Sequence, residues 1–132
     1  MKDVILDELQ IKVNESLLRH KSILDILTKF QESNARINRA VVKAVTNCGC
    51  VSINASKQQV PCDGDSIESL TGCMKTHLEG KICDGCREVI ERELGNNIFY
   101  LTALCNLLDI SVYDVFIKEY DKMDTLGKYT FR

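Results

Sequence analysis

Hydrophobic positions recur at intervals of three and four residues through most of the chain, which is the pattern of helices that bury one side. The spacing predicts a first helix over residues 4–27 and a second over residues 29–45. The apolar stripe of the second helix consists of Phe30, Ile37, Val41 and Ala44. No glycine or proline separates the two helices, so a tight turn near residues 28–33 is the expected boundary.

The same periodicity predicts a third long helix over residues 86–108 and a final helix after Ser111. Ser111 is followed three residues later by Asp114, a spacing that resembles a helix-capping box. The final helix carries Val115, Phe116 and Tyr120 on its apolar side, and residues 127–132 are expected to be frayed or docked on a partner.

Residues 51–82, between the second and third helices, have a mixed polar sequence and are predicted to loop out. One short helix is expected there, capped by Asp65 or Ser66 and running to about Leu78, where the sequence Glu-Gly-Lys of residues 79–81 breaks it. No run shows the alternation that marks strands. The predicted fold class is therefore all-α: an antiparallel helical bundle with a cysteine-containing insertion between its two central helices.

Composition supports one soluble domain over residues 1–132, with 45% hydrophobic and 27% charged residues. The net charge of −2 provides no basic field for nucleic acid. No segment approaches the roughly 20 apolar residues that cross a membrane, and the acidic N-terminus is not a secretory signal. The protein is therefore expected in the cytoplasm, where its seven cysteines would remain reduced and would serve metal or redox chemistry before disulfides.

Four cysteines form two close pairs, Cys48-x-Cys50 at the end of the second helix and Cys83-x-x-Cys86 at the start of the third. If these helices are antiparallel neighbours, the two pairs meet at one end of the bundle. Four thiolates suit structural, tetrahedral zinc better than an iron–sulfur centre. A helix N-terminus favours thiolate at the second pair.

Glycines within the two pairs, Gly49 and Gly85, are expected to permit the tight turns of a metal knuckle. A reversible dithiol switch and buried, unliganded thiols remain the alternatives to a metal site. Cys105 lies on the apolar side of the third helix and is interpreted as a core residue. No role is assigned to Cys62 or Cys73, and His77 is only an outside candidate as a ligand.

Residues 91–108, which read ERELGNNIFYLTALCNLL, resemble the second metal-binding helix of the MazG-like, all-α NTP pyrophosphohydrolases. That family reads E-x-E-L-G-D-x-[LI]-[FY]-x-L at this point, and the likeness continues through residues 109–115 and 118–127, about forty residues in all. The resemblance implies a MazG-like helical bundle, magnesium-dependent release of pyrophosphate from a nucleotide, and a homodimer or tetramer.

Carried over residue by residue, the family's acidic motifs are incomplete. The first motif, Glu-Glu-x-x-Glu, falls on residues 31–35, where only Glu32 is acidic. In the second motif Glu93 is present, but Asn96 replaces the aspartate. These three are the residual catalytic positions. The expected substrate-binding residues are Arg36 and Arg39 for phosphate, together with Asn97 and Tyr100 on the side of the helix that carries Glu93.

The resulting hypothesis is a divergent, catalytically impaired MazG-like protein with a four-cysteine zinc clasp and a nucleotide- or protein-binding role. One alternative is an active magnesium-dependent nucleoside triphosphate pyrophosphohydrolase, which would need magnesium as its cofactor. The other alternative is a thiol redox sensor.

Overall fold

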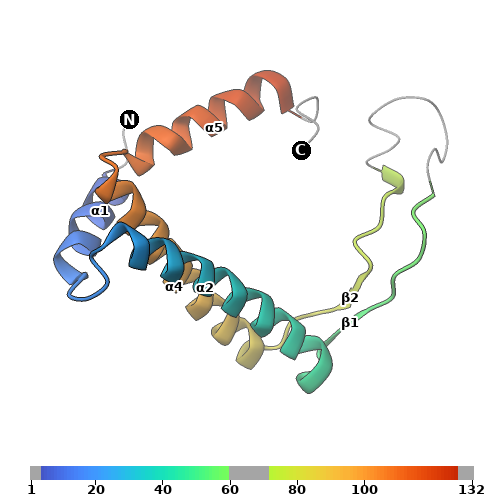
Figure 1. Ribbon diagram of the computed structural model, residues 1–132. Helices are drawn as coiled ribbons and strands as arrows, with labels where there is room; N and C mark the ends of the chain where they lie inside the picture. The colour runs from blue at the N-terminus through green and yellow to red at the C-terminus, as the bar shows by residue number, and fades with distance from the viewer. Residues whose placement is uncertain (1–3, 60–71, 128–132) are drawn as a thin grey trace.

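The protein is described by a computed structural model that covers residues 4–59 and 72–127. It is mostly helical, which confirms the all-α class, and it adds a two-stranded antiparallel ribbon that the sequence did not predict (Figure 1). The elements in chain order are α1 (Ile5–Ser16), α2 (Ile23–Lys43), the π-helical turn η1 (Ala44–Cys48), β1 (Val51–Ile53), β2 (Leu78–Gly80), α4 (Asp84–Leu107) and α5 (Val112–Leu126).

The predicted boundary between the first two helices is wrong. Helix α1 ends at Ser16, well before residue 27, and α2 begins at Ile23. The reason is a local cap: Ser22 has an extended backbone, and its Oγ accepts a hydrogen bond from the Leu24 backbone N–H at 3.3 Å. Because apolar residues continue at helical spacing on both sides of this cap, periodicity alone did not reveal the break.

The two helices of the second half are close to their predicted limits. Helix α4 begins at Asp84 and ends at Leu107, and α5 follows from Val112. Ser111 caps α5 as predicted, since its Oγ accepts the Asp114 backbone N–H at 3.2 Å. The chain turns between the helices at Asp109, whose φ is +55°. Helix α5 therefore leaves α4 at an angle of 106°.

The inserted segment forms a ribbon where a loop and a short helix were expected. Strand β1 pairs with β2 in antiparallel register, with Val51 opposite Gly80 and Ile53 opposite Leu78. Of the short helix predicted to reach Leu78, residues 72–73 are helical and residues 74–78 are not, and its predicted start at Asp65 or Ser66 lies outside the described residues. Five of the six strand residues are exposed, so no alternation of buried positions marked them as strands.

Helices α2 and α4 lie side by side and antiparallel, and α1 packs against α4 at the end of this hairpin away from the ribbon (Figure 1). The buried core cluster is at that end and joins Val13 of α1, Ile26 of α2 and Ala103 of α4, whereas Ala44 and Val51 are buried separately near the cysteines. Partly buried residues complete this core: Leu9, Leu17, Phe99 and Leu104. The other end of the hairpin, where the cysteines lie, contributes nothing to this core cluster.

Gln10 of α1 fastens the helices at the core end. Its Nε2 donates to Asn106 Oδ1 at 2.8 Å and to the Ile110 carbonyl at 3.0 Å. Its Oε1 accepts the Val112 backbone N–H at 2.9 Å. One side chain thus links α1 to the end of α4 and the start of α5. Among the described helices, none alone has the length and apolar character of a membrane span, whereas the bent pair α4 and α5 meets that criterion jointly.

Candidate metal centre and adjoining groove

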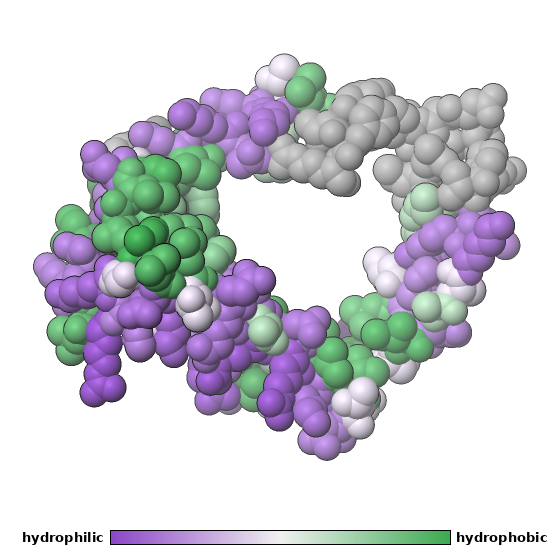
Figure 2. Space-filling view, viewed as in Figure 1, coloured by the Kyte–Doolittle hydropathy of each residue, from purple (hydrophilic) through white to green (hydrophobic). Residues whose placement is uncertain are grey.

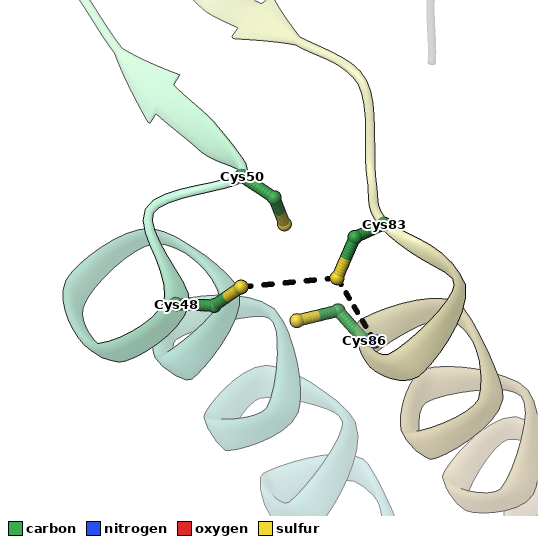
Figure 3. Close-up of side chains that lie close together, drawn as sticks. All are labelled: Cys48, Cys50, Cys83 and Cys86. Atoms are coloured by element: carbon green, nitrogen blue, oxygen red, sulfur yellow. Dashed lines mark hydrogen bonds between the residues drawn. The ribbon is translucent and has the colours of Figure 1, made fainter.

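The four paired cysteines converge at one end of the α2–α4 hairpin (Figure 3). Cys48 is the last residue of η1, Cys50 precedes β1, Cys83 caps α4, and Cys86 lies in the first turn of α4. One sulfur atom from each lies within 4.8 Å of the other three. The Sγ atoms of Cys48 and Cys83 are 3.7 Å apart. The predicted meeting of the two pairs is therefore confirmed.

The backbone of the first pair reverses through η1 and Gly49. The Gly49 N–H donates to the Ala44 carbonyl at 2.9 Å, which closes a wide π-type turn. Gly49 has φ +79°, a left-handed conformation that side chains other than glycine rarely adopt. This turn brings Cys48 and Cys50 to the same side of the chain. Gly85 differs from the prediction, because it lies inside the helical first turn of α4.

The ribbon holds the second pair against the first. Gly80 ends β2 with φ +89°, and a Cβ atom placed there would lie 2.7 Å from the Cys50 carbonyl oxygen. Only a residue without a Cβ permits this approach. The ribbon therefore sets where the chain leaves Cys50 and where it returns toward Cys83. Sequence reasoning interpreted Gly80 only as a helix breaker.

The start of α4 creates a polarised environment for two of the thiols. The Cys86 backbone N–H donates to Cys83 Sγ at 3.4 Å, and this bond is the main cause that lowers the Cys83 pKa to about 7. The neighbouring Cys83 side chain is the main cause that raises the Cys86 pKa to about 12. Cys83 is thus the thiol that becomes negative first, at the positive end of the α4 dipole.

A groove of about 770 Å³ runs from the cysteines along α2 and the first part of α4. It contains four of the residues assigned to substrate or catalysis from the sequence: Glu32, Arg36, Arg39 and Glu93. Three cysteines of the cluster line the same groove: Cys48, Cys83 and Cys86. The metal ligands and the polar positions, predicted from separate motifs, therefore belong to one continuous surface.

Lys43 also lines this groove and was missed from the sequence. Arg36, Arg39 and Lys43 follow one another at i, i+3 and i+7 on α2, so they share one side of the helix. The same spacing that linked the two arginines extends to the lysine. The groove is consequently more cationic along α2 than the sequence analysis indicated.

Glu32 is occupied by neighbouring cations. Its carboxylate lies 3.2 Å from Arg36 Nε and 3.3 Å from Lys29 Nζ. The hydrogen bond from Arg36 and then that from Lys29 are the main causes that lower the pKa of Glu32. Glu93 lines the opposite wall, on α4. Glu32 and Glu93 are the two carboxylates in the lining of the groove.

The other predicted site residues are not in the lining of the groove. Asn97 ties the two long helices together, because its Nδ2 donates to Ser33 Oγ at 2.9 Å and to Asn34 Oδ1 at 2.6 Å. Tyr100 meets Phe99 edge to face, with ring centroids 5.1 Å apart. Asn96 is exposed on α4. The catalytic role expected for Asn96 and the substrate-binding roles expected for Asn97 and Tyr100 remain predictions.

The remaining cysteines have separate environments. Cys105 is half-buried in α4, and burial raises its pKa. It is not one of the four cysteines of the cluster. Cys73 is disulfide-bonded, and the expectation that all cysteines stay reduced is wrong for this residue. Cys62 lies outside the described residues. His77 has φ +60° next to β2 and is not a member of the thiol cluster.

No protein-family model, no curated protein and no solved structure matches this chain.

Proposed function

We propose that this protein is a zinc-clasped helical hairpin that binds a nucleotide in the groove beside the clasp and does not hydrolyse it. In this proposal it is a catalytically impaired relative of the MazG-like pyrophosphohydrolases. The observation that carries the proposal is the convergence of Cys48, Cys50, Cys83 and Cys86 within 4.8 Å of one another, at the edge of a groove with a cationic wall.

The sulfur spacing supports zinc. With Zn–S bonds of about 2.3 Å, a tetrahedron of sulfur atoms has edges of about 3.8 Å. The Cys48–Cys83 distance of 3.7 Å already has this length, and small side-chain rotations bring in the other two sulfurs. Four protein ligands leave no open coordination position, which is the property of a structural site. The metal would join the end of η1 to the start of α4, where the core cluster does not reach.

The cationic wall supports a phosphate-bearing ligand. Arg36, Arg39 and Lys43 line the groove in a row along α2, and arginine binds phosphate oxygens through two parallel hydrogen bonds. The volume of about 770 Å³ lies within the range of small-molecule sites. Because Arg36 is shared with Glu32, Arg39 and Lys43 are the cations that we expect to contribute most to binding.

The acidic residues support loss of hydrolysis. Magnesium requires several oxygen ligands, usually carboxylates together with substrate phosphate oxygens. Of the two carboxylates in the groove, Glu32 is already paired with Lys29 and Arg36. Asn96, where the family has its aspartate, is not in the lining. The groove therefore has more cations that can bind phosphate than free carboxylates that can bind magnesium.

Three measurements on untagged protein test the proposal: elemental analysis, titration calorimetry with ATP and ADP, and a pyrophosphate-release assay with magnesium or manganese. We expect about one zinc per chain, nucleotide binding and no pyrophosphate. Changing Arg39 and Lys43 together to alanine should weaken binding at least about tenfold, whereas Arg92→Ala, a change on α4 outside the groove lining, should not.

Two results would overturn parts of the proposal separately. If the purified protein contains no metal but still binds nucleotide, the zinc site would be ruled out and the nucleotide-binding groove would be supported. If the protein releases pyrophosphate and the Glu93→Gln variant does not, the alternative of an active pyrophosphohydrolase would be supported, with Glu93 as a magnesium ligand.

A thiol redox sensor is the second candidate, favoured by the Cys48–Cys83 distance of 3.7 Å. In such a sensor a peroxide accepts two electrons and two protons from these thiols, which gives one disulfide and two molecules of water for hydrogen peroxide. Alkylation rates separate the candidates. A rate that rises when a chelator is added indicates zinc-protected thiols, whereas a fast rate that the chelator leaves unchanged indicates the sensor.

A further inference from the structure

The groove has two walls, α2 with η1 on one side and the first part of α4 on the other, and buried packing joins them only at the core end of the hairpin. Asn97 of α4 bonds there to Ser33 and Asn34 of α2. Toward the cysteines, no residue of α2 after Ser33 and no residue of α4 before Thr102 is buried. Figure 2 shows hydrophobic residues gathered at the core end and mostly hydrophilic residues along the middle of the hairpin. Elements with so few buried contacts separate at a low cost in free energy.

Small side chains keep the space between the walls open. The lining includes Ala35 and Ala40 of α2, Ala44 of η1 and Gly85 of α4. Alanine and glycine have at most one side-chain carbon, so these residues do not reach across the groove to the opposite helix. The two walls therefore need a tie outside the groove to hold them at one spacing.

The cysteine cluster provides this second tie, at the end of the groove away from the core (Figure 3). Within α2, η1 and α4, all of which the structure describes, no ion pair joins the two walls. The side-chain hydrogen bonds between them are those of Asn97 and the contact of Cys48 with Cys83. The spacing of the walls at this end thus depends on the thiols.

The remaining contacts at this end are weak. Ala44 of η1 and Val51 of β1 are buried, but both belong to the segment that follows α2. The ribbon adds backbone pairing between β1 and β2, yet five of its six residues are exposed. A two-stranded ribbon is only marginally stable by itself. Metal on the four thiols is therefore the strongest available means of fixing the walls.

We propose that zinc controls the nucleotide affinity of the groove, because zinc on the four cysteines fixes the spacing of the two walls that the nucleotide contacts. This inference rests on the nucleotide site proposed above. Arg39 and Lys43 lie on one wall, and Val89 and Glu93 lie on the other, so a ligand contacts both only at one spacing. Without zinc, only a fraction of the molecules has the walls at this spacing, and the apparent affinity falls by that fraction. Nucleotide occupancy would then follow the supply of zinc.

The charge of the metal centre does not reverse this effect. Zinc with four thiolates carries a net charge of about −2, which repels phosphate. Arg39 precedes Cys48 by nine positions in the sequence, which corresponds to about 13 Å along a helix. This distance exceeds the screening length of about 8 Å at physiological ionic strength. Repulsion at Arg39 is consequently weak, and the spacing of the walls decides the sign of the coupling.

The test measures both affinities on full-length protein in one anaerobic buffer. Titration calorimetry gives the dissociation constant of ADP before and after zinc is removed with a chelator that is then dialysed away. Competition with a zinc-binding dye gives the dissociation constant of zinc with and without ADP. We expect zinc removal to raise the ADP constant at least about tenfold, and ADP to lower the zinc constant by the same factor, because coupling between two ligands is reciprocal.

Two pairs of variants separate the coupling from its alternatives. Arg39→Ala should reduce the effect of ADP on zinc affinity and leave zinc affinity without ADP unchanged, whereas Arg92→Ala, outside the lining, should keep the full effect. An effect that persists in Arg39→Ala would be zinc binding by ADP in solution and would overturn the proposal. Cys48→Ser should weaken ADP binding as zinc removal does, and Cys105→Ser, outside the cluster, should not.

The remaining outcomes distinguish this inference from the proposed function. Zinc-loaded protein that does not bind ADP would remove the nucleotide site itself. Equal ADP affinity with and without zinc would keep that site and overturn its control by zinc. Circular dichroism of the zinc-depleted protein should show most of the helix content, because the core cluster is at the other end of the hairpin. Loss of nearly all helix would overturn the proposal, since the coupling would then reflect unfolding of the whole chain.

Discussion

The Sγ atom of Cys48 lies 3.7 Å from the Sγ atom of Cys83, although 35 positions separate these residues in the sequence. The contact joins the end of η1 to the start of α4 and so closes the long hairpin at the end opposite the core. The separation exceeds an S–S bond of about 2.05 Å and equals an edge of a zinc–thiolate tetrahedron. Folding of this end and metal binding are therefore expected to be linked.

Cys83→Ser should weaken zinc binding by more than about 100-fold, because a direct ligand matters more than the outer-shell partners, whose loss costs about 10–100-fold. Removing zinc from the wild-type protein with a chelator should have the same effect as this substitution, with reduced helix content where η1 meets α4. Competition with a zinc-binding dye measures the affinity. Cys105→Ser is the control, because Cys105 is outside the cluster. Equal zinc affinity in the two variants would contradict the four-cysteine site.

Gly80→Ala should loosen the metal site without removing a ligand. Its new Cβ would fall 2.7 Å from the Cys50 carbonyl oxygen, at a φ of +89° that alanine disfavours. The ribbon must shift, and Cys50 shifts with it. Gly85→Ala is the matched control, since a Cβ at Gly85 meets nothing within 4 Å and alanine favours a helix by about 0.5–1 kcal/mol. Zinc affinity and thermal unfolding of both variants check this. The expectation fails if zinc dissociates from the two variants with the same constant.

Gln10→Ala should lower the free energy of unfolding by about 2–3 kcal/mol. The change removes the bonds to Asn106 Oδ1, the Ile110 carbonyl and the Val112 backbone N–H, all from one side chain. Urea denaturation of metal-loaded protein measures the loss. Gln31→Ala, an exposed position on α2, should change stability by less than about 0.5 kcal/mol. A Gln10 variant as stable as the Gln31 variant would show that these bonds do not hold α1 in place.

Asn97→Ala should lower the free energy of unfolding by about 1–3 kcal/mol, because the buried Ser33 loses the hydrogen bond that its Oγ accepts from Asn97. Asn96→Ala should be close to neutral, because Asn96 is an exposed neighbour in the same helix. Urea denaturation of the pair measures the difference. A loss of nucleotide affinity in Asn97→Ala with unchanged stability would instead support the substrate-binding role inferred from the family resemblance.

The sequence by itself determined most features that depend on neighbouring residues, although the local Ser22 cap that separates α1 from α2 was missed. The periodicity of α4 and α5, the Ser111 cap and the tight turn at Gly49 are all local, and each is present as predicted. The meeting of the two cysteine pairs also followed from the sequence, because antiparallel helices bring the end of one beside the start of the next.

Tertiary structure decided the features that depend on distant partners. Strands β1 and β2 are held by backbone pairing across the insertion, which leaves no pattern in exposed side chains. Gly80 matters only because Cys50 packs against it. Asn97, expected on the substrate-binding side of α4, bonds to Ser33 and Asn34 on the neighbouring helix, a contact that the sequence did not indicate. Local hydrogen bonding and helix periodicity are encoded over a few residues, whereas these contacts exist only once the hairpin has closed.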